Sequence, residues 1–132
     1  MISHVDKRVG NIIQTLKDNG LYENTIIIFA GDNGLAVGQH GLMGKQNVYE
    51  HSVGVPLMIK AAAQHTGKKT ADLCYLIDVF PTLCDMLQLP VPQSVDGISL
   101  LSSLDGKEPV RELPILQLYG LINAAFPMEP GS

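Results

Sequence analysis

The sequence predicts an α/β fold in which a few mostly parallel strands are flanked by helices. Three observations lead to this prediction. Apolar residues recur at helical spacing near the N-terminus, two short runs of strand-forming residues follow, and a second stretch with helical spacing comes after them. The order helix, strand, long loop, strand, helix is typical of this class. The 132 residues, 45% of them hydrophobic, suit one modest domain.

The first predicted element is an amphipathic helix. Ser3 and Asp6 have the spacing of a capping box, which marks a helix start. The Asn-Gly pair at 19–20 supplies a stop. The apolar residues between these signals follow helical spacing: Val5, Val9, Ile12, Ile13 and Leu16.

Two strands are predicted, at 25–30 and 55–60. The first is a run of β-branched and aromatic residues without alternation, as expected of a central strand covered on both faces. Such a strand needs hydrogen-bonding partners on each side, and two or three strands cannot supply them while also covering both faces. We therefore expect further elements, from an absent N-terminal segment or from another copy of the chain.

The connection between the strands, 31–54, is long and rich in glycine and polar residues. Loops of this length are usually functional or mobile, so this is the place to look for chemistry. A second helix is predicted over 73–87, capped by Asp78 and with Pro81 in its first turn. Proline and glycine punctuate the chain beyond residue 90, and 115–121 is predicted as an edge strand or a helical turn.

Composition excludes some classes of partner. The nine basic and 13 acidic residues give a net charge of −4, and no basic face is available to neutralise a row of phosphates. Nucleic acid is therefore not expected as a partner. No stretch approaches the roughly 18 apolar residues of a membrane span, so no membrane partner is expected either. Cys74 and Cys84 match no metal-binding spacing and are expected to pack as small apolar residues.

Asp32 and Asn33 stand just past the end of the first predicted strand, where open α/β sheets place ligand sites. Their oxygens suit a hard cation such as calcium, although calcium takes six to eight oxygen ligands and these two residues cannot complete its shell. The run Gly-Asp-Asn-Gly at 31–34 is also compatible with an ordinary turn. Taken alone, the pattern favours the turn.

Farther along the loop, His40 and Lys45 stand among glycines. Glycine allows close backbone approach, and lysine is a compact donor for an oxyanion. Each of these residues alone also fits a solvated surface loop. The joint pattern, an Asp-Asn pair at a strand end followed by a histidine and a lysine, is much less expected by chance.

These residues resemble the C-terminal signature of type I sulfatases, which belong to the alkaline-phosphatase-like superfamily. The resemblance covers residues 1–110 as the C-terminal part of the catalytic domain, and 111–132 form a loosely matching tail. It implies a partial alkaline-phosphatase-like sandwich. The matching segments are 9–21, 24–34, 38–41, 44–45, 52–57, 76–83 and 96–100.

The resemblance also implies roles for individual residues. Asp32 and Asn33 would coordinate a calcium ion that holds the sulfate of a sulfate ester substrate, and Lys45 would contact sulfate oxygens. His40 belongs to the same motif and is expected near the site. Gln39 departs from the glutamate common in the family, which removes any contact that needs its charge.

The nucleophile of the family is missing from this sequence. Sulfatases use a formylglycine made from a Cys/Ser-x-Pro-Ser-Arg motif, and neither Cys74 nor Cys84 stands in one. The formylglycine and the remaining calcium ligands are expected in a missing N-terminal part, so the chain is predicted to be an inactive fragment. The alternatives are a phosphomonoester or phosphonate hydrolase of the same superfamily, and a noncatalytic module that binds a partner or self-associates through its uncovered sheet.

Overall fold

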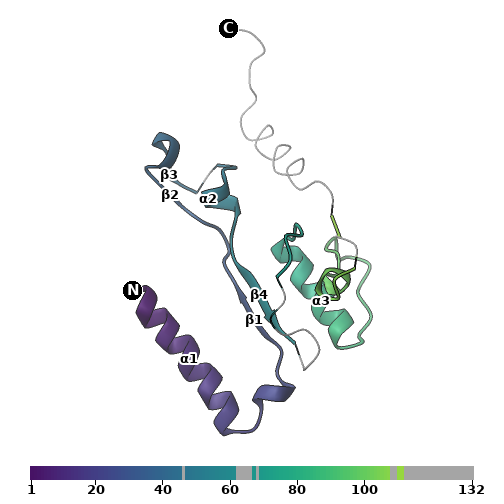
Figure 1. The fold of residues 1–132 in the computed structure, drawn as a ribbon. Coiled ribbons are helices and arrows are strands. Elements are labelled where there is room, and N and C mark those ends of the chain that lie inside the picture. Colours follow the sequence, from purple (N-terminus) through teal and green to yellow (C-terminus); the bar gives the residue numbers. More distant parts are fainter. Residues whose placement is uncertain (46, 62–66, 68, 108–109, 112–132) are drawn as a thin grey trace. The chain divides into compact units, whose positions relative to one another are not determined.

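The chain divides into two compact units, and each is described by itself (Figure 1). The first comprises Met1–Phe29 and Leu57–Gly67, and the second comprises Ala30–Pro56 and Lys68–Ser132. The predicted segment 115–121 lies outside the described residues. This computed structural model describes residues 1–45, 47–61, 67, 69–107 and 110–111.

The first unit begins with helix α1, Ile2–Asp18. Its predicted end is confirmed, because Asn19 is the C-cap and Gly20 follows with a φ of 67° that favours glycine. Its predicted start is wrong. The N-cap is Met1, whose carbonyl accepts the N–H groups of His4 and Val5, so Ser3 lies inside the helix and caps nothing.

Strand β1, Ile27–Ala30, pairs with β4, Leu57–Lys60, side by side in Figure 1. Both strands fall within their predicted ranges. The Lys60 ammonium anchors the entry to β1, because it donates to the carbonyls of Tyr22 and Thr25 at 2.5 and 3.2 Å. Phe29 is 40% exposed, so within the described part of the chain β1 is not the doubly covered central strand that the sequence predicts.

The long predicted loop of the second unit contains regular structure. Strands β2, Ala36–Val37, and β3, Met43–Gly44, form an antiparallel hairpin in which Ala36 faces Gly44. The turn between them holds η2, Gln39–Gly41, and the short helix α2, Glu50–Val53, follows. Helices and strands are thus mixed as expected, but this pair departs from the expectation of mostly parallel strands.

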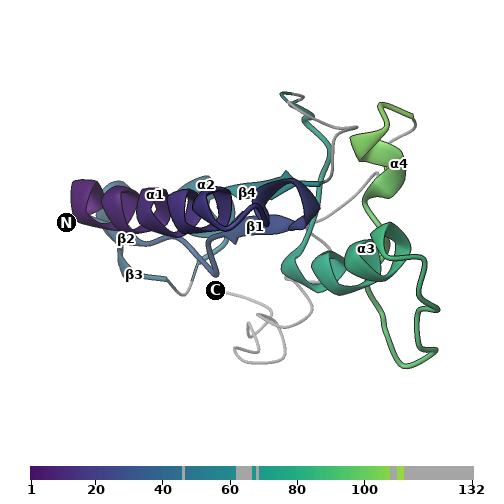
Figure 2. The same ribbon diagram turned by 90° about the horizontal axis from the view of Figure 1, so that it is seen from below.

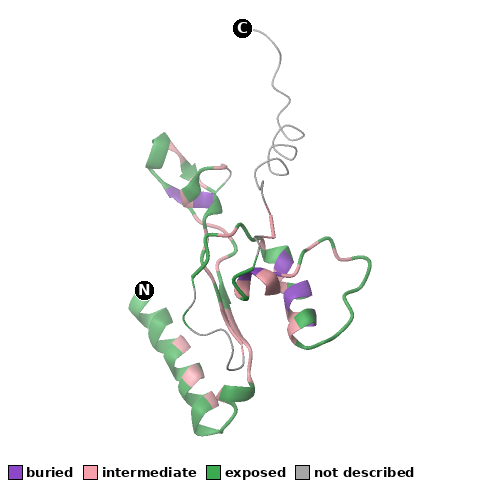
Figure 3. Cartoon of the chain, turned by 45° about the vertical axis from the view of Figure 1, so that its right-hand side comes forward, coloured by how far each residue is buried: buried purple, intermediate pink, exposed green. Residues whose placement is uncertain are grey.

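The core of the second unit lies around α3, Val79–Met86, and α4, Leu101–Leu104, which Figure 2 shows next to each other. Buried positions gather on these helices in Figure 3. Cys84 is buried as expected, whereas Cys74 is exposed. None of the described helices combines the length and apolar character needed to cross a lipid bilayer. The buried residues of this core are Pro81, Thr82, Cys84, Leu100 and Ser103.

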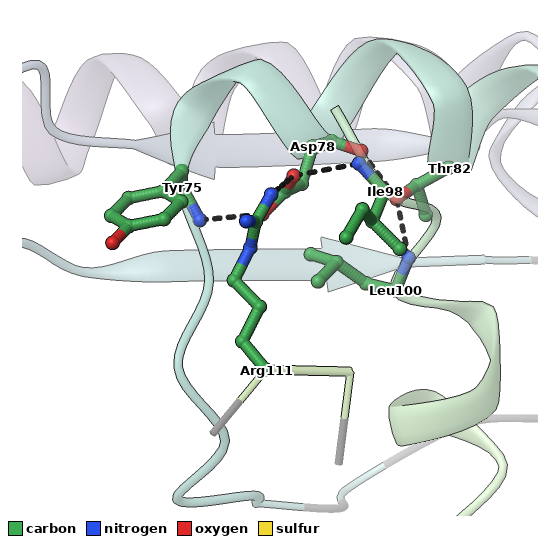
Figure 4. Close-up of polar contacts among 6 residues, drawn as sticks. All are labelled: Tyr75, Asp78, Thr82, Ile98, Leu100 and Arg111. Atoms are coloured by element: carbon green, nitrogen blue, oxygen red, sulfur yellow. Dashed lines mark hydrogen bonds and ion pairs between the residues drawn. The ribbon is translucent and has the colours of Figure 1, made fainter. Parts of the chain in front are cut away.

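Asp78 joins three segments of this unit (Figure 4). Its carboxylate is fully buried and accepts the Tyr75 N–H at 2.8 Å and the Ile98 N–H at 2.8 Å. The Arg111 guanidinium donates to both carboxylate oxygens, at 2.6 and 3.3 Å. The sequence predicts that Asp78 caps α3. Asp78 is the N-cap residue, but its side chain makes no capping bond to that helix. It instead closes the preceding turn η3, Leu76–Asp78, and binds Arg111, 33 positions away.

The ionisation of Asp78 reflects these contacts. Burial by itself raises the pKa of the carboxyl group, but the hydrogen bonds from Arg111 and from the N–H groups of Ile98 and Tyr75 outweigh burial and hold the pKa below its ordinary value. The carboxylate is thus charged in the folded state. Two hydrogen bonds of the Thr82 hydroxyl extend this network. The hydroxyl donates to the Asp78 carbonyl and accepts the Leu100 N–H at 2.9 Å.

Candidate functional site

The turn after β1 is held by main-chain bonds. The Gly31 N–H donates to the Pro56 carbonyl at 3.0 Å, and the Gly34 N–H donates to the Ser52 carbonyl at 2.9 Å. At Gly34 a β-carbon would lie 2.0 Å from the His51 carbonyl oxygen, so only glycine fits there. The turn is therefore pressed against the segment 51–56, which fixes the backbone between the two glycines.

Asp32 and Asn33 occupy that fixed stretch. The Asp32 side chain is exposed, and none of the residues that the structure describes hydrogen-bonds to its carboxylate. Asn33 is half-buried, and its amide nitrogen donates to the Gly34 carbonyl at 2.7 Å. This bond orients the amide group and leaves its oxygen Oδ1 available to another partner.

That partner is Lys45. Its ammonium nitrogen Nζ lies 3.4 Å from Asn33 Oδ1, a long and solvent-exposed hydrogen bond across 12 positions of sequence. The hairpin delivers the lysine to this place, because β3 ends at Gly44, whose φ of 110° is one that favours glycine. The structure therefore brings together two of the predicted site residues, Asn33 and Lys45, with Asp32 directly adjacent in the turn.

His40 lies elsewhere, at the tip of the hairpin. Its ring stacks on Tyr49 with centroids 4.3 Å apart, and His51 completes the group at 5.7 Å from Tyr49 and 5.8 Å from His40. No spacing pattern in the sequence predicts such a stack, and sequence reasoning assigned no role to Tyr49 or His51. The nitrogen Nε2 of His51 and the hydroxyl of Ser52 are buried and unpaired within the described residues.

The donor set suits a hard cation. Asp32 and Asn33 offer carboxylate and amide oxygens, which are the ligands that calcium prefers. Within the described part of the chain, however, there is no group of three His, Cys, Asp or Glu residues that could hold a metal ion. These residues fit one side of a calcium shell, and Lys45 adds a positive charge beside it.

Comparison with known proteins places the fold and these residues in one family. A family model described as Sulfatase matches residues 1–89, which include the turn, the hairpin and all of α3. The chain belongs to the sulfatase family.

Two curated relatives show the extent of the similarity. Arylsulfatase K of Bos taurus is 34% identical over 103 residues, which are 78% of this chain and 19% of the relative. Choline-sulfatase of Rhizobium meliloti (strain 1021) is 36% identical over 121 residues, 89% of this chain and 23% of the relative. The chain thus spans about a fifth of the length of the relatives it matches.

Solved structures show the same fold. A phosphonate monoester hydrolase from Silicibacter pomeroyi matches with a TM-score of 0.74 and 34% sequence identity. The match covers 83% of this chain and 22% of that one. The predicted alkaline-phosphatase-like architecture agrees with these comparisons at the level of the family fold.

Proposed function

We propose that this chain supplies part of the sulfate- and calcium-binding site of a sulfuric ester hydrolase and is inactive by itself. The observation that supports this proposal most directly is the 3.4 Å contact between Lys45 Nζ and Asn33 Oδ1 at the end of β1. It joins a cation and an oxygen ligand that lie 12 positions apart, in a chain whose residues 1–89 match the sulfatase family.

Each side chain then has one task. Asp32 and Asn33 hold a calcium ion through their oxygens, and the bound ion would polarise the sulfate ester. Lys45 donates to a non-bridging sulfate oxygen and stabilises the negative charge that grows there during hydrolysis. Its exposed ammonium group can release Asn33 and turn to the sulfate without losing a strong bond, because the existing contact is long.

The nucleophile and the remaining calcium ligands come from outside this chain. The 132 residues contain no Cys/Ser-x-Pro-Ser-Arg motif, so the formylglycine is assigned to another part of a longer polypeptide. The coverage of only 19–23% of the relatives supports this assignment. Binding groups that orient a sulfate ester do not hydrolyse it without a nucleophile, which is why the isolated chain is expected to be inactive.

The test is substitution in the native polypeptide that carries this chain. Lys45→Ala should lower kcat/KM for 4-nitrophenyl sulfate by about 100- to 1,000-fold, the usual loss when one donor to a developing oxyanion is removed. Lys69→Ala removes another lysine and serves as the matched control, with no expected change. Unchanged hydrolysis by the Lys45 variant, or turnover by residues 1–132 alone, contradicts the proposal.

A phosphonate monoester hydrolase is the second candidate, favoured by the 0.74 TM-score of the Silicibacter pomeroyi enzyme. Sulfate and phosphonate esters present similar tetrahedral oxyanions, and the residues described above serve either. Comparing kcat/KM for 4-nitrophenyl sulfate with that for the monoester 4-nitrophenyl phenylphosphonate separates the two candidates. A preference for the phosphonate replaces the sulfatase assignment while leaving the roles of the three residues intact.

A noncatalytic, self-associating module is the remaining alternative. Exposed apolar side chains on the β1–β4 pair, Phe29 at 40% and Met58 at 58%, favour it. Sedimentation equilibrium of residues 1–132, combined with melting of the native polypeptide in the presence and absence of calcium, discriminates between the readings. A stable dimer whose melting temperature ignores calcium supports the module, and a calcium-dependent rise supports the site.

A further inference from the structure

We infer that His40 is a positioning residue, which acts through a ring stack with Tyr49 to hold Lys45 at the site. This inference rests on the proposed role of Lys45. The His40 and Tyr49 rings are 4.3 Å apart and inclined by only 16°, so they lie nearly face to face. The contact closes a loop of chain between residues 40 and 49, and Lys45 stands near the middle of that loop.

Two further bonds tie the second half of the loop to Lys45. The Asn47 N–H donates to the Lys45 carbonyl at 3.0 Å, and the Tyr49 N–H donates to the Asn47 side-chain oxygen at 3.1 Å. The first half of the loop contains the β2–β3 hairpin, whose Gly38 N–H donates to the Leu42 carbonyl at 2.9 Å. Lys45 is therefore connected to Tyr49 by hydrogen bonds and to His40 by the hairpin.

The stack joins these two halves and anchors them. His51 lies 5.7 Å from the Tyr49 ring, and the residue after it, Ser52, accepts the Gly34 N–H in the turn that carries Asn33. The same rings thus link the loop of Lys45 to the segment against which the turn is pressed. Without the stack, the lysine would still follow the hairpin, but the loop would be free to move away from Asn33.

The backbone at His40 has an uncommon conformation. Its φ of 54° is a left-handed conformation that glycine or asparagine adopts more readily than histidine. The neighbouring Gly38 and Gly41 also have positive φ, as such a tip requires. Asparagine suits this backbone at least as well as histidine, so His40→Asn removes the ring without straining the turn.

Four variants of the native polypeptide test the inference with 4-nitrophenyl sulfate. His40→Ala should lower kcat/KM about three- to tenfold, the loss expected of an aromatic contact. His40→Phe keeps a stacking ring and should restore most of this loss, whereas His40→Asn suits the backbone but lacks the ring and should not. His4→Phe, at an exposed histidine of α1, is the matched control and should leave kcat/KM unchanged.

A double-mutant cycle separates positioning from general stability. If His40 acts through Lys45, His40→Ala has no further effect in a Lys45→Ala background, because the group that it positions is gone. Three outcomes would overturn this inference without touching the proposed function. They are losses of kcat/KM that multiply when His40→Ala and Lys45→Ala are combined, full activity of His40→Asn, and a His40→Phe variant as impaired as His40→Ala. Unchanged hydrolysis by Lys45→Ala overturns both this inference and the proposed function.

Discussion

Replacing Asp78 with alanine should cost the second unit much of its stability. The carboxylate has four hydrogen bonds, one main-chain N–H and one guanidinium N–H on each oxygen. Asp78→Ala leaves the N–H groups of Tyr75 and Ile98 and the charge of Arg111 without this partner. Gly97 supports the tight packing here, because a β-carbon on it would lie 2.2 Å from the Ile77 carbonyl oxygen.

The magnitude follows from these groups. An unsatisfied buried donor costs about 1–3 kcal/mol, and breaking a buried ion pair costs about 3–5 kcal/mol. The Arg111 side chain is 17% exposed and can turn partly to water, which removes some of the penalty. We therefore expect the free energy of unfolding to fall by about 3–5 kcal/mol. That is a large share of the roughly 5–15 kcal/mol that stabilises an ordinary domain.

Urea unfolding of residues 1–132, followed by far-UV circular dichroism, measures this difference. Asp85→Ala, at an exposed carboxylate of α3, is the matched control and should change stability by less than about 0.5 kcal/mol. Adding Arg111→Met to Asp78→Ala should recover part of the loss, since it removes the unpaired charge. A loss under about 1 kcal/mol for Asp78→Ala would refute the reasoning, because four bonds to a buried group cannot be that weak.

Two further predictions concern pH and glycine. Because the pKa of Asp78 is lowered in the folded state, the unfolded chain takes up the proton at a higher pH than the folded chain does. The free energy of unfolding should therefore fall as the pH drops below 3.8 toward the folded-state pKa. Urea titrations in acid should show this loss for the native sequence and not for Asp78→Ala. Gly34→Ala should cost more than about 2 kcal/mol in thermal unfolding, since its β-carbon would strike the His51 carbonyl. By contrast, Gly10→Ala, in open space on α1, should gain about 0.5–1 kcal/mol, and equal effects of the two glycines would contradict this account.

Local sequence patterns correctly predicted the end of α1 and the position of β1. The Asn-Gly stop of α1 and the β-branched run of β1 are properties of a few adjacent residues, and both appear where expected. The capping-box pattern at Ser3 failed because the helix begins two residues earlier, with Met1 as its N-cap. The two-residue strands β2 and β3 went unpredicted, since so short a ladder has no periodicity that a sequence could reveal.

The candidate site was predictable for a different reason. Asn33 and Lys45 were singled out by a family motif, because the helix or strand propensity of single residues carries no information about contacts 12 positions apart. In the structure Lys45 Nζ lies 3.4 Å from Asn33 Oδ1. The bond from Arg111 to Asp78 spans 33 positions and had no such motif, so the sequence suggested only a helix cap for Asp78. The stack of His40 on Tyr49 was missed in the same way, because it depends on how the hairpin folds back.

The turn that carries Asp32 and Asn33 has a consequence for how the neighbouring segment is able to change. Main-chain atoms alone tie it to the neighbouring segment, through the carbonyls of Ser52 and Pro56. Substitutions of the side chains along 51–56 therefore leave these two bonds in place as long as the backbone keeps its path. Evolution, or a mutagenesis library, is free to vary exposed side chains of this segment such as Val53 while Asp32 and Asn33 stay where they are.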